Sequence, residues 1–133
     1  MEALTTKLRI DDWDESAVEE LDDGSKFTRA QVRLQDGADG LHSGSLCMLA
    51  YYRPDGTSEY VTLLRLSGSL DGHAGAMVLH GSGCYDGTTA SGRMSSVPDS
   101  ATGEWVGISG TCTSESTKAD FPFMPLTLTY HLE

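Results

Sequence analysis

The segment from Leu46 to Gly81 alternates strand-like runs with two tight turns. The runs LCMLAYYR, EYVTLLRLSG and HAGAMVLH are rich in apolar, β-branched and aromatic side chains, which favour strands. Asp55-Gly56 and Asp71-Gly72 separate them, and Asp-Gly is a favoured hairpin pair because both residues tolerate a positive φ. The spacing of these turns predicts long antiparallel strands, as in an up-and-down β-barrel.

The rest of the chain adds strands and no long helical pattern. Residues 27–34 alternate cleanly between a polar and a less polar face, and Asp86-Gly87 interrupts a weaker run of small residues. Glycine within strands marks the bulges and bends that barrel closure requires, and this chain has 15 glycines. We predict an all-β fold over residues 1–133, one antiparallel up-and-down barrel of about eight strands. The predicted strands are 4–10, 27–34, 46–53, 59–68, 73–80, 83–96, 104–113 and 127–132.

Three connections stand out. Residues 11–25 are strongly acidic and are predicted to form a solvated loop or a short helical turn, with Ser16 as the N-cap and Glu19 at the capping-box position. Residues 36–45 form a glycine-rich turn, and residues 114–125 form a polar, then proline-rich loop before the last strand.

Two predicted strands are apolar on both faces. In residues 46–53 and 60–66 the alternating positions carry large apolar side chains on either side. Such strands must be covered on both faces, and the barrel interior covers only one. The outer face is therefore expected to meet a subunit neighbour or the acidic N-terminal segment, and a homo-oligomer, with a dimer favoured, is the preferred prediction.

Charge and cysteine content indicate which classes of partner and which cellular location to expect. The net charge of −11 disfavours nucleic acid and anionic membranes, and no apolar run approaches the length of a membrane span. The N-terminal residues lack the pattern of a signal peptide, and three cysteines without a CxxC pair are typical of reduced thiols, so a cytoplasmic location is expected. Cys47, within a strand, is expected to be buried.

Known catalytic motifs are absent from the sequence. There is no P-loop, GxSxG elbow or HExxH pattern, and the four histidines are isolated, so no metal and no cofactor are predicted. Aromatic and methionine residues are instead spread over the predicted strands. Such side chains suit a cavity for a hydrophobic small molecule, or they simply fill the barrel. The candidate ligand-binding residues are Met48, Tyr60, Leu64, Met77, Met94 and Trp105.

Several stretches resemble a bacterial family of unknown function, domain of unknown function 3224. They are Trp13-Asp14-Glu15, Thr28-Arg29-Ala30, Ala50-Tyr51 with Asp55-Gly56, Gly68-Ser-Leu-Asp-Gly72, Gly75 to Leu79, and Ser100-Ala-Thr-Gly-Glu-Trp-Val-Gly-Ile-Ser-Gly110. The last is similar to the family signature SGTGxLxGLxG. The resemblance implies a calycin-like barrel of the allene oxide cyclase and avidin type. The chain departs from the pattern at Leu64, where family members tend to carry a glutamate.

The resemblance implies two functions for a cavity. The first is a cofactor-independent cyclase or isomerase that folds a polyketide- or terpenoid-like intermediate into one conformer. Its candidate catalytic residues are the donors Tyr52, Tyr85 and Tyr130, with Arg65 or His80 as the charged partner. The alternative is a non-catalytic binder or carrier, as in lipocalin and avidin barrels. A filled barrel whose outer apolar face binds another protein is a third possibility.

Overall fold

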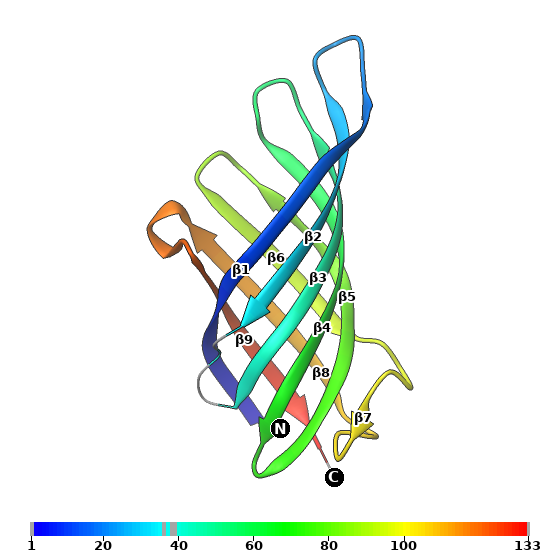
Figure 1. The fold of residues 1–133 in the computed structure, drawn as a ribbon, viewed down its shortest axis with the longest axis vertical. Helices are drawn as coiled ribbons and strands as arrows, with labels where there is room; N and C mark the ends of the chain where they lie inside the picture. Colours follow the sequence, from blue (N-terminus) through cyan, green and yellow to red (C-terminus); the bar gives the residue numbers. More distant parts are fainter. Residues whose placement is uncertain (1, 36, 38–39, 133) are drawn as a thin grey trace.

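The computed structural model describes residues 2–35, 37 and 40–132, which form one antiparallel sheet closed into a ring (Figure 1). Each long strand pairs with the next, β6 pairs with β8, and β1 pairs with β9 to close an eight-stranded ring. The predicted all-β, up-and-down architecture is confirmed. The strands are β1 (Glu2–Glu20), β2 (Lys26–Gln35), β3 (Leu41–Tyr52), β4 (Ser58–Leu70), β5 (His73–Tyr85), β6 (Thr89–Ser96), β7 (Thr102–Gly103), β8 (Ser109–Thr117) and β9 (Phe123–His131).

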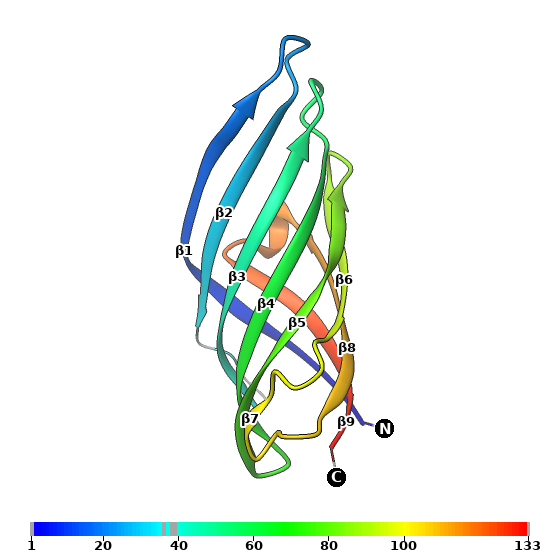
Figure 2. The ribbon, with the colours of Figure 1, turned by 90° about the vertical axis from the view of Figure 1, so that its right-hand side faces the viewer.

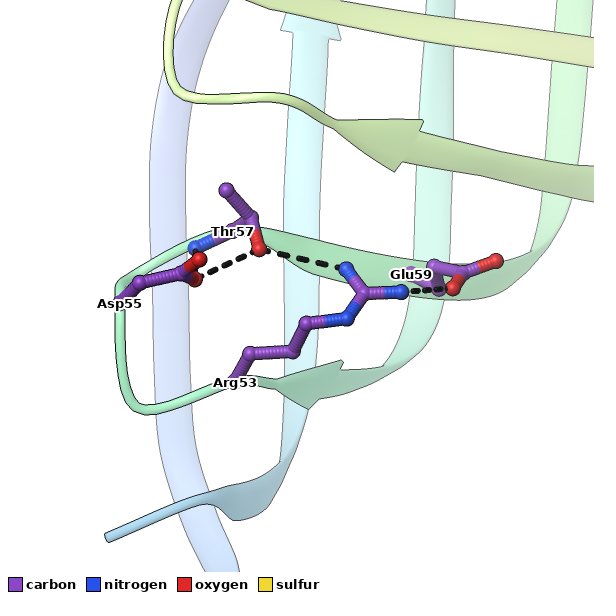
Figure 3. Close-up of polar contacts among 4 residues, drawn as sticks. All are labelled: Arg53, Asp55, Thr57 and Glu59. Atoms are coloured by element: carbon purple, nitrogen blue, oxygen red, sulfur yellow. Dashed lines mark hydrogen bonds and ion pairs between the residues drawn. The ribbon is translucent and has the colours of Figure 1, made fainter.

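Both predicted Asp-Gly pairs form hairpin turns, with different geometries. Asp71 and Gly72 both have positive φ, 50° and 80°, and directly join β4 to β5. In the β3–β4 turn only Gly56 is left-handed, at φ 91°. There the Thr57 amide and hydroxyl donate to Asp55 at 2.9 and 2.7 Å. Arg53 donates to Thr57 and pairs with Glu59, as Figure 3 shows, so side chains brace this turn.

The turns divide the barrel into two unlike ends. The β1–β2, β3–β4 and β5–β6 turns lie at one end, and the β8–β9 connection opens on the same side but lies lower, near the middle of the molecule; together they form what we call the mouth (Figure 2). The β4–β5 turn and the long β6–β8 connection lie at the opposite, closed end. This follows from the up-and-down order, because alternate connections must return to the same end. Three mouth turns share the sequence Asp-Gly-Ser/Thr: 23–25, 55–57 and 86–88.

The acidic segment is a strand, which corrects the predicted loop or helical turn over residues 11–25. β1 continues to Glu20, and only residues 21–25 form a turn. Two of its acidic residues lie opposite basic ones on β2, with Asp12 paired to Arg33 and Glu20 to Lys26. Opposite charges across neighbouring strands offset the poor strand propensity of aspartate and glutamate. The sequence of β1 alone does not reveal this partner.

Two other connections are shorter than predicted. Strand β8 runs to Thr117, and a 3₁₀ turn at Lys118–Asp120 precedes β9, so residues 114–125 are only partly loop. Strand β3 begins at Leu41, inside the predicted turn 36–45, because Leu41 is fully buried. Positions 36, 38 and 39 of that predicted turn lie outside the described residues. Among the described residues, no helix is long and apolar enough to cross a membrane.

The core fills the closed half of the barrel. Leu64, Leu66 and Met77 are fully buried there with the other inward leucines. Trp105, from the β6–β8 connection, is also fully buried, and its indole Nε1 donates to the His73 carbonyl at 2.7 Å. A Cβ on Gly75 would lie 2.5 Å from the Trp105 ring, so this glycine admits the indole. Trp105 lies in the turn before β8, not in the predicted strand 104–113.

The outer apolar face of β3 and β4 is uncovered in the single chain. Leu49, Val61 and Leu63 are each more than half exposed. The acidic segment does not lie over them, because it is part of the sheet as β1, so the expectation that it covers this face is wrong. Cys47 lies on the same face and is exposed, which corrects its predicted burial.

Candidate functional site

A pocket of about 280 Å³ occupies the mouth half of the barrel, above the filled core. Mouth-proximal positions of seven strands contribute to its wall. The lining residues are Ile10, Trp13, Leu46, Met48, Tyr52, Ser58, Tyr60, Thr62, Tyr85, Ala90, Gly92, Met94, Ser114, Ser116 and Met124. Its size is near the lower end of the range for small-molecule sites, and its wall is mainly apolar and aromatic. The interior is therefore filled at one end and open at the other.

A β-bulge in β1 determines which of its side chains reach this pocket. Leu8 and Ile10 point inward below the bulge. The pairing with β2 shifts between Ile10 and Asp12, which changes the phase of alternation by one residue. Trp13 and Glu15, at odd positions, therefore share the inward face with their β2 partners Val32 and Ala30.

The Glu15 carboxylate is held by three donors beside the pocket. The hydroxyls of Thr28 and Tyr52 donate to its Oε2 at 2.7 and 2.8 Å, and the Trp13 indole donates to Oε1 at 2.9 Å. Partial burial opposes ionisation, but these hydrogen bonds outweigh it, with a contribution from Lys26, and the pKa of Glu15 is lowered. Glu15 is therefore an anion at neutral pH.

Two pocket tyrosines, Tyr52 and Tyr60, remain protonated phenols. Burial, together with the hydrogen bond to Glu15 and its charge, raises the pKa of Tyr52 to about 12. Burial also raises the pKa of Tyr60, whose hydroxyl donates to the Ser91 carbonyl at 3.3 Å. The Tyr85 hydroxyl donates to the Gly87 carbonyl at 2.9 Å, which ties its ring to a mouth turn.

The structure brings together five of the residues singled out from the sequence. Met48 and Tyr52 on β3, Tyr60 on β4, Tyr85 on β5 and Met94 on β6 all line the pocket. They meet because inward positions of neighbouring strands lie side by side in a barrel wall.

Three other predicted ligand-binding residues lie away from the pocket. Leu64, Met77 and Trp105 are fully buried in the core of the closed half. None of the three lines the pocket. Trp105 and Met77 lie near the closed end, and Leu64 lies one inward position below Thr62 on β4.

The remaining predicted catalytic residues do not join the pocket tyrosines either. Tyr130 is at the closed end, with its hydroxyl 3.0 Å from Glu2 and 3.4 Å from Asp71. Burial and these two carboxylates raise its pKa to about 12. Arg65 and His80 are exposed on the outer surface, because their strand positions alternate with the inward ones.

Sequence reasoning missed Trp13, Glu15 and Thr28 as site residues. The sequence pattern places Trp13 and Glu15 in a loop or short helical turn, and only the pairing of β1 with β2, together with the bulge, turns them inward. The family resemblance associates a carboxylate with position 64, whereas in this chain Glu15 on β1 supplies the carboxylate beside the pocket.

Metal-binding and nucleophilic groups are not gathered in this site. No group of three or more His, Cys, Asp or Glu side chains suited to a metal ion occurs among the described residues. Cys112 is buried in the core, and burial raises the pKa of its thiol to about 12, which keeps it protonated and inert.

The comparisons with known proteins identify a family whose function is described as unknown. No curated protein matches the chain. The crystal structure of a protein of unknown function from the DUF3224 family of Shewanella oneidensis MR-1 is similar over 99% of both chains, with a TM-score of 0.74 and 20% identity. That likeness concerns the fold. Residues 4–130 match the family described as "Protein of unknown function (DUF3224)". This match spans nearly the whole barrel, and the chain therefore belongs to the DUF3224 family.

Proposed function

We propose that this protein is a small-molecule-binding barrel whose ligand occupies the pocket in the mouth half. The observation that carries the proposal is the contrast between the two halves of the interior. Leucines and Trp105 fill the closed half, whereas methionines and tyrosines surround open space near the mouth. Such a wall offers polarisable and aromatic contacts to an apolar ligand.

Binding without catalysis is the role that the side-chain chemistry supports best. Glu15 already accepts three hydrogen bonds and has a lowered pKa, so it is a weak general base. Tyr52, with a pKa raised to about 12, is a weak acid. A binder or carrier, in the manner of lipocalin and avidin barrels, needs neither group to transfer a proton.

A cofactor-independent cyclase or isomerase is the second candidate. Its support is the hydroxyl of Tyr60, whose 3.3 Å bond to Ser91 is long enough for a ligand to replace. A barrel of the allene oxide cyclase type would hold a flexible polyketide- or terpenoid-like intermediate in one conformer and exclude water. Mass spectrometry of the products of a gene deletion strain tests this role, which unchanged products would exclude. We propose a cytoplasmic location for the protein under both candidate functions.

We also propose that the outer apolar face pairs with a second copy of the chain. Along β4, Glu59 lies on the mouth side of Val61 and Leu63, and Arg65 lies on the other side. A two-fold axis through Thr62 would oppose Val61 to Leu63 and Glu59 to Arg65 of the second copy. The face is therefore self-complementary in both charge and apolar contact, as an isologous dimer requires.

Binding of a neutral apolar dye, Nile red, tests the ligand site. Gly92 lines the pocket, and a Cβ there would meet no atom within 3.6 Å, so Gly92→Leu fills the pocket without a backbone clash. Ser95→Leu, on the exposed side of the same strand, is the matched control. We expect one saturable site that is lost in Gly92→Leu and kept in Ser95→Leu.

Two outcomes would overturn the binding proposal. One is the absence of saturable dye binding to the wild-type chain. The other is undiminished binding to folded Gly92→Leu together with loss of binding in Leu63→Glu, which would place the dye on the outer face. Ala90 lines the same pocket, so Ala90→Leu is a second variant that fills it.

A further inference from the structure

Most hydrogen-bond donors around the pocket already donate to acceptor groups of the protein. The phenolic hydroxyls of Tyr52, Tyr60 and Tyr85 donate to Glu15, to the Ser91 carbonyl and to the Gly87 carbonyl. A hydroxyl has one hydrogen and two lone pairs, so each phenol that donates to the protein presents its oxygen to a ligand as an acceptor.

The other polar groups at the wall extend this pattern. The Trp13 indole donates to Glu15, and the Ser114 hydroxyl donates to the Pro125 carbonyl at 2.6 Å. Ser58 and Ser116 contribute hydroxyls that can donate or accept. No cationic side chain is among the lining residues. The wall therefore offers a ligand mainly acceptor oxygens and the faces of aromatic rings.

The mouth is strongly acidic. Ten acidic and three basic side chains lie on the strand ends and turns 15–26, 53–59, 85–89 and 115–123. The excess of seven carboxylates is most of the net charge of −11 of the whole chain. In the three Asp-Gly-Ser/Thr turns, hydrogen bonds from Ser25, Thr57, Thr88 and Thr89 lower the pKa of each aspartate. The charge concentrated at an opening attracts ligands of opposite sign.

One cationic side chain of the protein, Lys26, already lies beside these aromatic and acidic groups. The Lys26 ammonium group lies 5.4 Å from the centroid of the Tyr52 ring, and its charge acts on Glu15. This is the range of a cation–π contact. Lys26 is exposed at the start of β2, so it lies at the rim and can swing toward solvent.

We propose that the ligand of this barrel is a small organic cation, an amine or quaternary ammonium with an apolar body. The body fills the space between Met48 and Met94, and the charged head lies among the rings of Trp13, Tyr52 and Tyr60, close to Glu15. This inference rests on the proposed small-molecule site and adds the chemical class of its ligand. Aromatic rings beside a carboxylate are a recurrent means of recognising ammonium groups.

The test compares three probes of nearly the same shape and different charge. Benzyltrimethylammonium is a cation, neopentylbenzene is its neutral isostere, and benzenesulfonate is an anion. Their binding is followed in nitrogen-15 NMR spectra through the two tryptophan indole signals. Trp13 lines the pocket, and Trp105, buried at the closed end, is the internal control; Trp105→Phe assigns the two signals.

We expect the cation to bind at least tenfold more tightly than its neutral isostere and the anion not to bind. The cation should shift the Trp13 signal and leave that of Trp105 in place. Glu15→Gln should weaken the cation about tenfold and leave the neutral probe unchanged. Asp99→Asn removes the same charge at the closed end and should change neither. Lys26→Met should strengthen cation binding severalfold, because the competing rim cation is lost.

The outcomes separate this inference from the proposed function. If the neutral isostere binds as tightly as the cation, or if neither Glu15→Gln nor Lys26→Met alters cation binding, the cationic ligand class is wrong and the pocket remains a binding site. If no probe shifts the Trp13 signal and Nile red does not bind, the proposed site is wrong as well.

Discussion

The hydroxyl of Tyr52 donates to Oε2 of Glu15 at 2.8 Å and so links β3 to β1 across the intervening strand β2. Thr28 on β2 donates to the same oxygen, so one carboxylate ties three strands together. The link lies beside the pocket, where the interior is not filled by apolar side chains. Polar contacts therefore stabilise the wall of the mouth half, as leucine packing stabilises the closed half.

The first prediction concerns Tyr52→Phe. Loss of one of three donors should raise the pKa of Glu15 toward its ordinary value and lower the free energy of unfolding by about 1–2 kcal/mol. Carboxyl-carbon NMR titration and urea unfolding measure the two effects. Tyr51→Phe, on the outer face of the same strand, should change neither. An unchanged titration in Tyr52→Phe would contradict the role of this hydrogen bond.

The second prediction is a pH dependence of stability that Glu15 controls. Its pKa is lower in the folded chain than its ordinary value of 4.5, because hydrogen bonds outweigh burial. The resulting stabilisation is fully present above pH 4.5 and is lost as the pH falls through the folded pKa. Glu15→Gln should flatten this part of a plot of unfolding free energy against pH, whereas Asp99→Asn should retain it. Identical profiles for wild type and Glu15→Gln would refute the prediction.

The third prediction separates the two halves of the barrel. Trp105→Ala removes a fully buried side chain from the closed end and should lower the free energy of unfolding by about 3–5 kcal/mol. Trp105→Phe keeps most of the packing but loses the bond to His73, so its loss should be smaller, about 1–2 kcal/mol. Folded Trp105→Phe should bind Nile red as the wild type does. Weakened dye binding in this variant would show that the closed end shapes the pocket.

The fourth prediction tests the outer face of β4. Leu63→Glu adds a negative charge beside the proposed two-fold axis and should shift the chain to a monomer in analytical ultracentrifugation. Thr113→Glu, at an exposed position of β8, adds the same charge outside the apolar face and should leave the dimer intact. A wild-type chain that sediments as a monomer at high concentration would remove the dimer proposal.

The sequence by itself determined most of the strands, the hairpin turns and the closed antiparallel fold, but not the strand formed by residues 11–20. Alternation and Asp-Gly turns are local signals, because strand side chains repeat every two residues and a positive φ is a property of single residues. The same alternation placed Met48, Tyr52 and Tyr60 on one face of their strands. The alternation does not determine whether this face points into the barrel, because a shift of one residue in the strand register moves every side chain to the opposite face.

The tertiary structure decided which of these residues share a site. Trp13 lines the pocket and Glu15 lies beside it only because a bulge shifts β1 against β2, and two acidic residues of this strand, Asp12 and Glu20, face basic partners across the sheet. Tyr130 shares the interior with Tyr52 but lies at the other end, since distance along the barrel axis depends on strand register. Pairing between strands is a long-range property. The local sequence pattern therefore predicts the strands of the barrel wall, whereas only the closed sheet shows which residues meet in the pocket.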